Sequence, residues 1–301
     1  MQFNRFQTLS DIFILIGLVI IGSLAVACLF ALLTMPYIHL SFIEILGLAK
    51  SNADPKYVPY IKLFTTVTAF GTWVLSAWVL LRIKGKSVAD SWQIKAPQPS
   101  GVLMFLPILF LALIFASAFL LNLNAQLPLP ESIKHFTSQE NKKMMEDFLR
   151  MDNTNQLMVN LLMIALAPAL FEEIFFRGTL QRLLIELFGN VHYGILFCSF
   201  TFAAIHLNAE QFIPMFFLAL VLGYVCYYSR SIWPSVILHF LNNGFAVFVT
   251  YYQHQLPVAK AIAADNYTPP VVTIVLAFMV IGGFFYWLIK KHQILNTPTY
   301  E

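Results

Sequence analysis

Three ionisable side chains stand close together in an otherwise apolar stretch of the sequence. The segment "ALFEEIFFRGTL" carries the adjacent carboxylates Glu172 and Glu173 and the guanidinium of Arg177. A carboxylate or an arginine at the centre of a membrane helix costs about 2.5–3.5 kcal/mol on insertion scales. Sequences that accept this cost usually turn such groups toward the protein interior, so polar partners are expected at a similar depth.

Two histidines in separate apolar segments can provide such partners. The segment "FTFAAIHLN" contains His206 four residues after Phe202, and "SVILHFLNNG" contains His239 four residues before Asn243. Either histidine alone is more typical of a hydrogen-bonded core residue than of a catalyst. Two histidines, a glutamate pair and an asparagine in three apolar segments together favour a polar site inside the membrane.

Helical spacing separates the two glutamates. Residues four apart share one face of a helix, so Glu173 and Arg177 are expected to form a structural ion pair. Glu172 lies about 100° further round the helix, so it is free to face His206 and His239. The alternative interpretation of these residues is an interhelical salt-bridge network that carries out no reaction.

The residue types predict attack of an activated water on a carbonyl group. Glu172 is expected to take a proton from that water, and His206 to share the water and later pass a proton to a leaving amine. His239 and Asn243 fall on one stripe of a helix because they are four residues apart. Both can donate hydrogen bonds toward developing negative charge, as an oxyanion site requires.

Composition assigns the chain to the polytopic membrane class. Of its 301 residues, 59% are hydrophobic and 11% are charged, whereas a soluble domain usually holds about 25% charged residues. The net charge of +3 gives no sign of a nucleic-acid surface. Cys28, Cys198 and Cys226 all lie in apolar runs, and their odd number and their spacing predict packing thiols.

A membrane-spanning helix needs roughly 20 mostly apolar residues. This criterion predicts an all-α, polytopic bundle of about eight transmembrane helices that enclose a polar intramembrane cavity. The helices are expected at about 11–35, 61–82, 101–122, 156–187, 191–208, 211–228, 232–252 and 270–290. The fourth is long, so its C-terminal part is expected to bend or to project beyond the hydrocarbon.

The chain is expected to form one membrane domain over residues 1–301, with four parts. These are an N-terminal three-helix part (1–122), a loop with an interfacial amphipathic helix (123–155), a core with the chemistry (156–252), and a last helix with a tail (253–301). The amphipathic helix is expected within 137–149, where residues 137–140 have capping-box spacing. An ordinary exposed loop helix is the alternative interpretation of this segment.

The membrane location and the side of the termini are predicted from the Lys and Arg residues and from the first apolar run. That run is too long for the apolar part of a signal peptide, so it is expected to be the first transmembrane helix. Lys and Arg concentrated in short segments favour cytoplasmic N- and C-termini. The composition and compact length favour a bacterial inner (cell) membrane.

The three segments also resemble a known family. "EEIFFR", "FAAIH" and "HFLNN" are similar to the EExxxR, FxxxH and HxxxN motifs of the CPBP family, formerly called Abi, which contains CAAX prenyl proteases and bacteriocin-processing intramembrane proteases. The resemblance covers roughly residues 156–252. It implies an eight-helix bundle with a cavity open to the membrane and to one aqueous side.

The resemblance also implies an endopeptidase and assigns roles within it. Glu172 would be the general base assisted by His206, while His239 and Asn243 would stabilise the oxyanion and Glu173 and Arg177 would support them. The implied partners are membrane lipid and a membrane-anchored or lipidated peptide or protein, either prenylated CAAX-type or a bacteriocin or peptide precursor. No nucleic-acid partner is expected.

A metal requirement stays open at this point. The family is often labelled metalloprotease, and Glu172, His206 and His239 would supply three zinc ligands with water in the fourth position. The sequence has no HExxH helix, and a metal-free Glu/His mechanism uses the same residues. We therefore expect metal-independent chemistry, with zinc as the alternative.

Two other classes of function compete with hydrolysis. A proton-coupled transporter would also use intramembrane Glu and His, but the sequence has neither an inverted repeat nor paired interrupted helices. A non-catalytic immunity or scaffold protein would use the polar cluster to hold a partner helix. Serine and aspartyl intramembrane proteases fit poorly because the sequence has neither a GxSG nor a GxGD motif.

Overall fold

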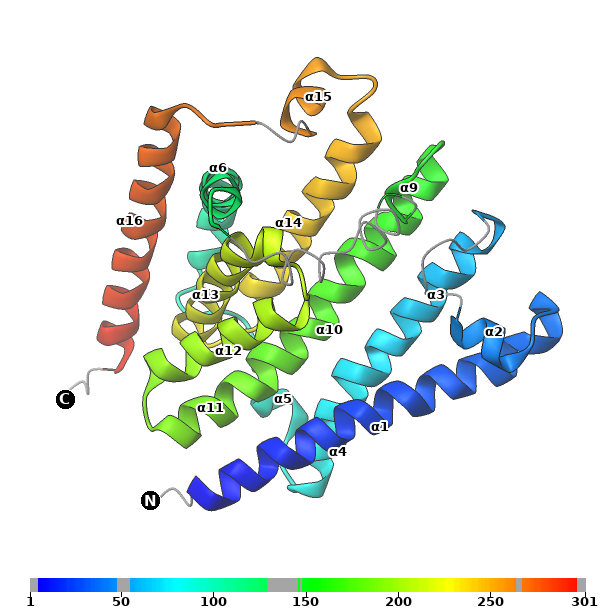
Figure 1. Cartoon of the computed structure of the whole chain (residues 1–301). Coiled ribbons are helices and arrows are strands. Elements are labelled where there is room, and N and C mark those ends of the chain that lie inside the picture. Colours follow the sequence, from blue (N-terminus) through cyan, green and yellow to red (C-terminus); the bar gives the residue numbers. More distant parts are fainter. Residues whose placement is uncertain (1–4, 48–54, 129–145, 147, 264–266, 297–301) are drawn as a thin grey trace.

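The structure is a computed structural model that describes residues 5–47, 55–128, 146, 148–263 and 267–296. Within these ranges every regular element is a helix (Figure 1). The elements are α1 (Arg5–Ile38), α2 (Phe42–Gly47), η1 (Pro55–Tyr57), α3 (Val58–Ala69), η2 (Phe70–Leu75), α4 (Ser76–Ile83), α5 (Val88–Ser91), α6 (Val102–Ala125), α9 (Thr154–Asn160), η3 (Leu161–Leu166), α10 (Ala167–Phe175), η4 (Phe176–Leu180), α11 (Gln181–Phe188), α12 (Val191–Ile205), η5 (Ala209–Gln211), α13 (Phe212–Ser229), α14 (Trp233–Tyr252), α15 (Pro257–Ala263) and α16 (Val271–Asn296).

The all-α membrane architecture predicted from composition is confirmed, but a count of eight spans is not. Among the described residues, six helices are long and apolar enough to cross a membrane: Arg5–Ile38, Val58–Ile83, Val102–Ala125, Thr154–Phe188, Ala209–Ser229 and Val271–Ile294. The other two predicted spans correspond to α12, which has 15 residues, and α14, which has 20. Helix α12 is short, and α14 carries His239, Asn242 and Asn243, which lower its hydropathy.

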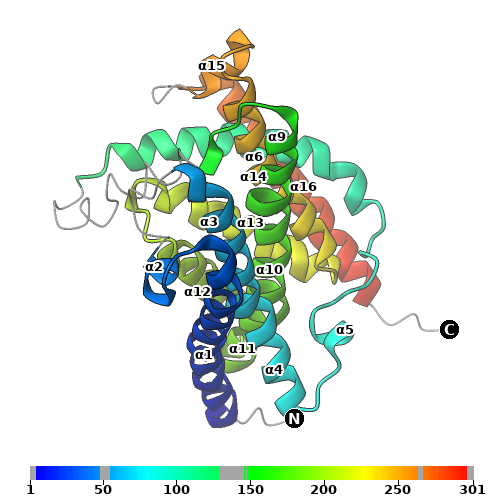
Figure 2. The ribbon, with the colours of Figure 1, turned by 90° about the vertical axis from the view of Figure 1, so that its right-hand side faces the viewer.

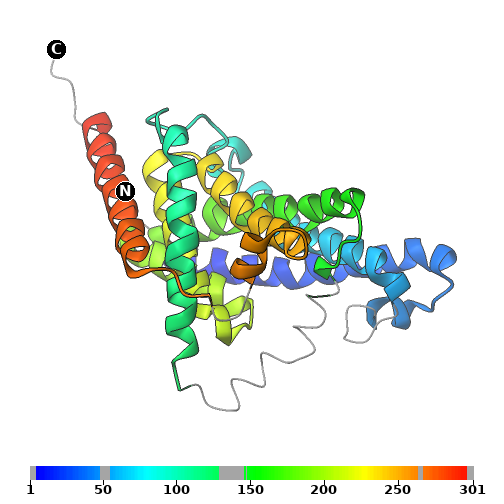
Figure 3. The same ribbon diagram turned by 90° about the horizontal axis from the view of Figure 1, so that it is seen from above.

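The helices that carry the three motifs lie in the middle of the bundle. Helix α10 packs against α14 and against η2, while α12 packs against α11 and α13. Helices α6 and α16 lie side by side along one flank (Figure 3). On the opposite flank α1 runs alongside α3 and α4 (Figure 2). The motif helices are therefore enclosed by neighbours on both flanks.

One continuous helix from Thr154 to Phe188 carries the acidic motif. Its 35 residues span about 50 Å at 1.5 Å per residue, well beyond a hydrocarbon core of about 30 Å. The helix winds as a π-helix over η3 and again over η4, on either side of α10. Such π segments often mark functional sites, and here they enclose the short α-helical stretch that presents Glu172 and Glu173.

A tight reversal returns the chain from α11 to α12. Gly189 ends α11 in the left-handed region at φ 64°, which a glycine adopts without steric cost. Asn190 then caps α12, and its side-chain oxygen accepts hydrogen bonds from the backbone N–H groups of His192 and Tyr193. The reversal sends α12 back along the long helix, toward the acidic residues.

Two other sequence predictions meet different outcomes. All three cysteines are free, and Cys198 and Cys226 are buried, as predicted for packing thiols. The predicted amphipathic helix within 137–149 lies outside the described residues except for residues 146, 148 and 149.

Helix α1 approaches η2 closely through a pair of glycines. A Cβ atom on Gly22 would lie 2.6 Å from the carbonyl oxygen of Gly71 and 2.9 Å from Oγ of Ser76. The Ser76 hydroxyl hydrogen-bonds to the backbone of α1 by donating to the carbonyl of Leu18 at 2.9 Å. Small residues at such a crossing let two backbones come together.

We predict that Gly22→Ala separates these helices and lowers the stability of the protein. Overpacking of a tight contact costs about 1–3 kcal/mol, and a Cβ at Gly22 would meet backbone atoms that cannot move aside. Gly17→Ala is the matched control, because a Cβ on Gly17 meets nothing within 4 Å. Thermal unfolding in detergent should give a lower Tm for Gly22→Ala only, and equal melting of the two variants would contradict this packing.

Candidate active site

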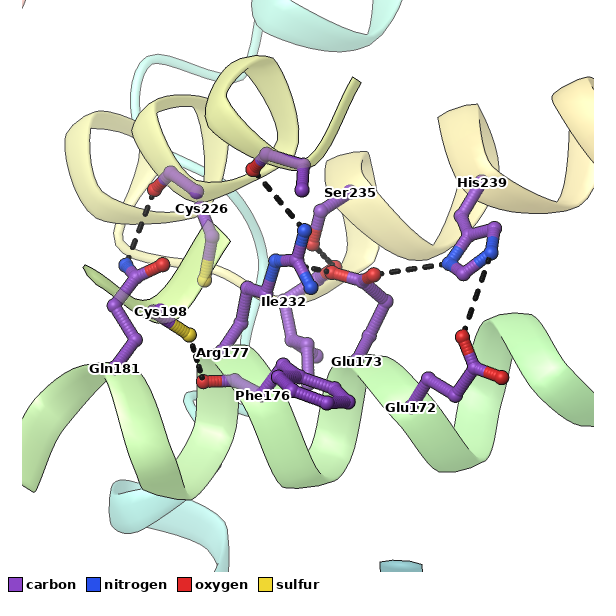
Figure 4. A network of polar contacts seen from close by, with 12 residues as sticks. Glu172, Glu173, Phe176, Arg177, Gln181, Cys198, Cys226, Ile232, Ser235 and His239 are labelled. Carbon is purple, nitrogen blue, oxygen red and sulfur yellow. Dashed lines mark hydrogen bonds and ion pairs between the residues drawn. The ribbon is translucent and has the colours of Figure 1, made fainter. Parts of the chain in front are cut away.

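Glu173 is buried between a cation on its own helix and an imidazole on another. Its Oε2 lies 3.1 Å from Nε of Arg177, as expected from the four-residue spacing. Its Oε1 lies 3.0 Å from Nδ1 of His239, which α14 presents (Figure 4). The side chains of Glu173 and His239 are 0% and 4% exposed. This carboxylate therefore links the first and third motifs.

Arg177 joins α12 and α13 to the same cluster. Its Nη2 donates to the carbonyl oxygen of Ala219 on α13 at 3.1 Å. Its guanidinium carbon lies 5.0 Å from the centre of the Phe202 ring on α12. Nε and Nη1 have no hydrogen-bond acceptor among the described residues, so the attraction between Arg177 and Glu173 is mainly the Coulombic attraction of two buried opposite charges.

The contact with Glu173 determines which nitrogen of His239 carries the proton. An ionised carboxylate only accepts hydrogen bonds, so Nδ1 of His239 must be the donor. In the neutral ring Nε2 is then an acceptor with a free lone pair. Nε2 lies 3.9 Å from Oε2 of Glu172, which is too far for a direct hydrogen bond.

Glu172 differs from Glu173 in its access to water. Its side chain is 15% exposed, whereas that of Glu173 is fully buried. Oε2 of Glu172 and Nε2 of neutral His239 are both acceptors, and a water between them could donate one hydrogen to each. The pair is thus arranged to hold and polarise a water molecule.

His206 and Asn243 lie at the edges of this arrangement. His206 follows the last residue of α12 and is exposed, and its Nδ1 lies 2.7 Å from the carbonyl oxygen of Phe202. The Phe202 ring contacts both imidazoles, with its centre 4.8 Å from that of His206 and 5.9 Å from that of His239. Among the described residues, no hydrogen bond or ion pair joins His206 to Glu172, so its predicted share in the water stays a prediction.

Asn243 lies one turn after His239 on α14, as its spacing predicts. Its side-chain oxygen accepts a hydrogen bond of 3.4 Å from the amide of Asn242. This contact leaves the amide hydrogens of Asn243 available to a ligand, which is the property that an oxyanion donor needs.

Glu172, His206 and His239, the three alternative zinc ligands, do not come together in the structure. The part of the chain that the structure describes contains no group of three His, Cys, Asp or Glu side chains placed to hold a metal ion. Glu172 and His239 approach each other, but His206 does not complete the set. We therefore derive no catalytic step through a metal.

Sequence reasoning missed the contact between Glu173 and His239. It assigned Glu173 to Arg177 alone, because helical spacing reports only neighbours within one helix. A chemical signal was present, since a histidine that works in one tautomer needs an acceptor on its other nitrogen. Phe202, which contacts both imidazoles and Arg177, was noted only as a marker of spacing.

We predict that isosteric changes at the two adjacent glutamates alter the stability of the protein by very different amounts. Glu173→Gln leaves the buried Arg177 charge uncompensated, and loss of one partner of a buried ion pair typically costs about 3–5 kcal/mol. Glu172→Gln should change stability by less than about 1 kcal/mol, because Glu172 has only the 3.9 Å contact. Thermal unfolding of both variants measures the difference, and similar melting temperatures would argue against the buried role of Glu173.

Comparison with known protein families gives a match that covers the motif region. Residues 154–245 match the family described as type II CAAX prenyl endopeptidase Rce1-like. No curated protein and no solved structure matches the chain. The matched segment contains all three motifs and the helices that position them, from α9 into α14. The resemblance to the CAAX prenyl protease family is therefore confirmed, and residues 154–245 are the part of the chain that carries it.

Proposed function

We propose that the protein is an intramembrane endopeptidase that hydrolyses peptide bonds of membrane-associated substrates with water activated by Glu172. One observation carries the proposal. Glu172 and Nε2 of His239 lie 3.9 Å apart, while Glu173 holds the opposite nitrogen of the same ring. The family match to an endopeptidase supports the same class of reaction.

The proposed reaction begins with Glu172 as general base. Glu172 takes one proton from the water, and the hydroxide attacks the carbonyl carbon of the scissile bond. The carbonyl oxygen becomes an oxyanion, and the amide hydrogens of Asn243 stabilise it. The C–N bond then breaks. The leaving amine receives the proton that Glu172 took from the water, and His206 passes it on.

His239 can stabilise the oxyanion with a hydrogen bond in only one of its protonation states. Because its Nδ1–H is committed to Glu173, it can donate through Nε2 only when the ring carries a second proton. The buried carboxylate of Glu173 stabilises that imidazolium, and Arg177 on its other side keeps Glu173 ionised. Glu173 and Arg177 thus have positioning roles in the proposal, and they do not touch the substrate.

The proposed substrates are membrane-anchored or lipidated peptides, either of the prenylated CAAX type or bacteriocin and peptide precursors. Six described helices are suited to crossing a bilayer, so a site among them meets substrates that are held at the membrane. We further propose a bacterial inner membrane, with both termini in the cytoplasm.

We predict that Glu172→Ala abolishes cleavage while the fold is retained. Loss of a general base typically lowers the rate by about 10²–10⁴-fold. The measurement is cleavage of a panel of isoprenylated and unmodified C-terminal peptides by purified wild type and variant. Glu44→Ala is a control, since Glu44 is an exposed carboxylate outside the candidate spans.

Cleavage assays combined with a cellular assay and a liposome flux assay separate the enzyme from the two alternatives, and two results would contradict the assignment as an enzyme. An immunity or scaffold protein would keep its cellular phenotype in the Glu172→Ala variant, and no peptide would be cleaved by wild type. A proton-coupled transporter would give flux in liposomes without proteolysis.

We predict that cleavage continues in the presence of a chelator. The proposed chemistry uses Glu172, His206, His239 and Asn243 without a metal-bound water. Activity of wild type is measured before and after EDTA and again after addition of zinc. Activity lost to EDTA and restored by zinc would contradict the metal-free mechanism and leave the peptidase assignment intact.

A further inference from the structure

A cavity separate from the proposed active site lies where α1 begins and where α4 and α11 end. Its volume is about 440 Å³, and it is bordered by these three helices, by residues that follow α4, and by Tyr227 of α13. It reaches Gly178 and Thr179 of the long helix, but Glu172, Glu173 and His239 do not line it. The candidate spans Val58–Ile83 and Thr154–Phe188 end near this cavity, so it lies toward the polar ends of the spans and not at their apolar centres.

The acidic side chains of the cavity already have partners within the protein. Oδ1 of Asp11 lies 2.9 Å from Nζ of Lys84. The hydroxyl of Thr8 donates to Oε1 of Glu186 at 3.1 Å. Asp11 is therefore paired with the charge of Lys84, whereas the neutral hydroxyl of Thr8 leaves the negative charge of Glu186 in the cavity.

Two cations of the cavity form no ion pair with a residue that the structure describes. Lys86 forms no ion pair with any residue that the structure describes, and it is exposed on the cavity wall. Arg182 donates from Nη1 to the backbone carbonyls of Asp90, at 2.7 Å, and Ser91. These two carbonyls orient the guanidinium without neutralising its charge, because both acceptors are neutral. The lining thus holds three cations, Lys84, Lys86 and Arg182, against the carboxylates of Asp11 and Glu186, so the cavity has one positive charge in excess.

The same cavity also has an apolar wall. Leu80 and Leu81 of α4 and Leu183 of α11 line it beside the cations, and all three are buried. A site with positive charge at the polar boundary and an apolar wall beside it suits an amphiphile with an anionic head. Basic pockets between transmembrane helices bind lipid head groups in this way.

We propose that this cavity binds the phosphate group of an anionic membrane phospholipid, with Lys86 and Arg182 as its charge partners. The lipid would tie the start of α1 to the ends of α4 and α11. The proposal concerns residues outside the proposed catalytic machinery, so it stands or falls independently of peptidase activity.

The test is a lipid-binding titration of the full chain in detergent, followed by native mass spectrometry. The probe is short-chain phosphatidylglycerol, and inorganic phosphate is added as a competitor in a second arm. The variants are Lys86→Ala, Lys86→Arg and, as a matched control, Lys290→Ala. Lys290 is an exposed lysine of α16 that lies over the ring of Tyr286 and does not line the cavity.

We expect Lys86→Ala to weaken binding about fivefold, the effect typical of one lysine near an anionic head group. Lys86→Arg should restore the affinity, and Lys290→Ala should match wild type. Equal affinities for Lys86→Ala and wild type would overturn the site. Displacement of the lipid by inorganic phosphate at equal concentration would overturn the assignment to a phospholipid, because it would indicate a site for free anions.

Discussion

The arrangement of the motif helices depends on one buried carboxylate, that of Glu173. It lies 3.1 Å from Arg177 and 3.0 Å from His239, and its side chain is fully buried. A charge in this position is very costly without partners, so the helices must keep Arg177 and His239 on either side of it. Arg177 in turn contacts α12 through Phe202 and α13 through the carbonyl of Ala219. A single electrostatic requirement thereby fixes α10, α12, α13 and α14 relative to one another.

This constraint has a chemical consequence at the neighbouring residue. Because Glu173 occupies Nδ1 of His239, the ring presents Nε2 toward Glu172, which keeps some access to water. Two adjacent glutamates therefore acquire different environments through the helical rotation of about 100° between them. One is dry and paired, and the other is partly exposed and available to a water molecule. Such separation of environments is how one pair of carboxylates can take different roles.

Much of the fold could be predicted from the sequence, because the apolar runs are long and separated by polar connections. The helices appear close to the expected positions, and the Glu173–Arg177 pair follows from helical spacing. The number of spans could not be predicted, because α12 is short and α14 is polar at the site itself. The π-helical segments that flank α10 also leave no pattern in a purely apolar stretch. Contacts between helices, such as Glu173 with His239, depend on packing that spacing alone does not report.

The tautomer of His239 tests the central claim most directly. In protein labelled with ¹⁵N-histidine, the NMR signals of His239 can be assigned by comparison with a His239→Gln variant. The account predicts that neutral His239 carries its proton on Nδ1 in wild type, and that Glu173→Gln removes this preference. A neutral ring protonated on Nε2 in wild type, or a tautomer unaffected by Glu173→Gln, would contradict it.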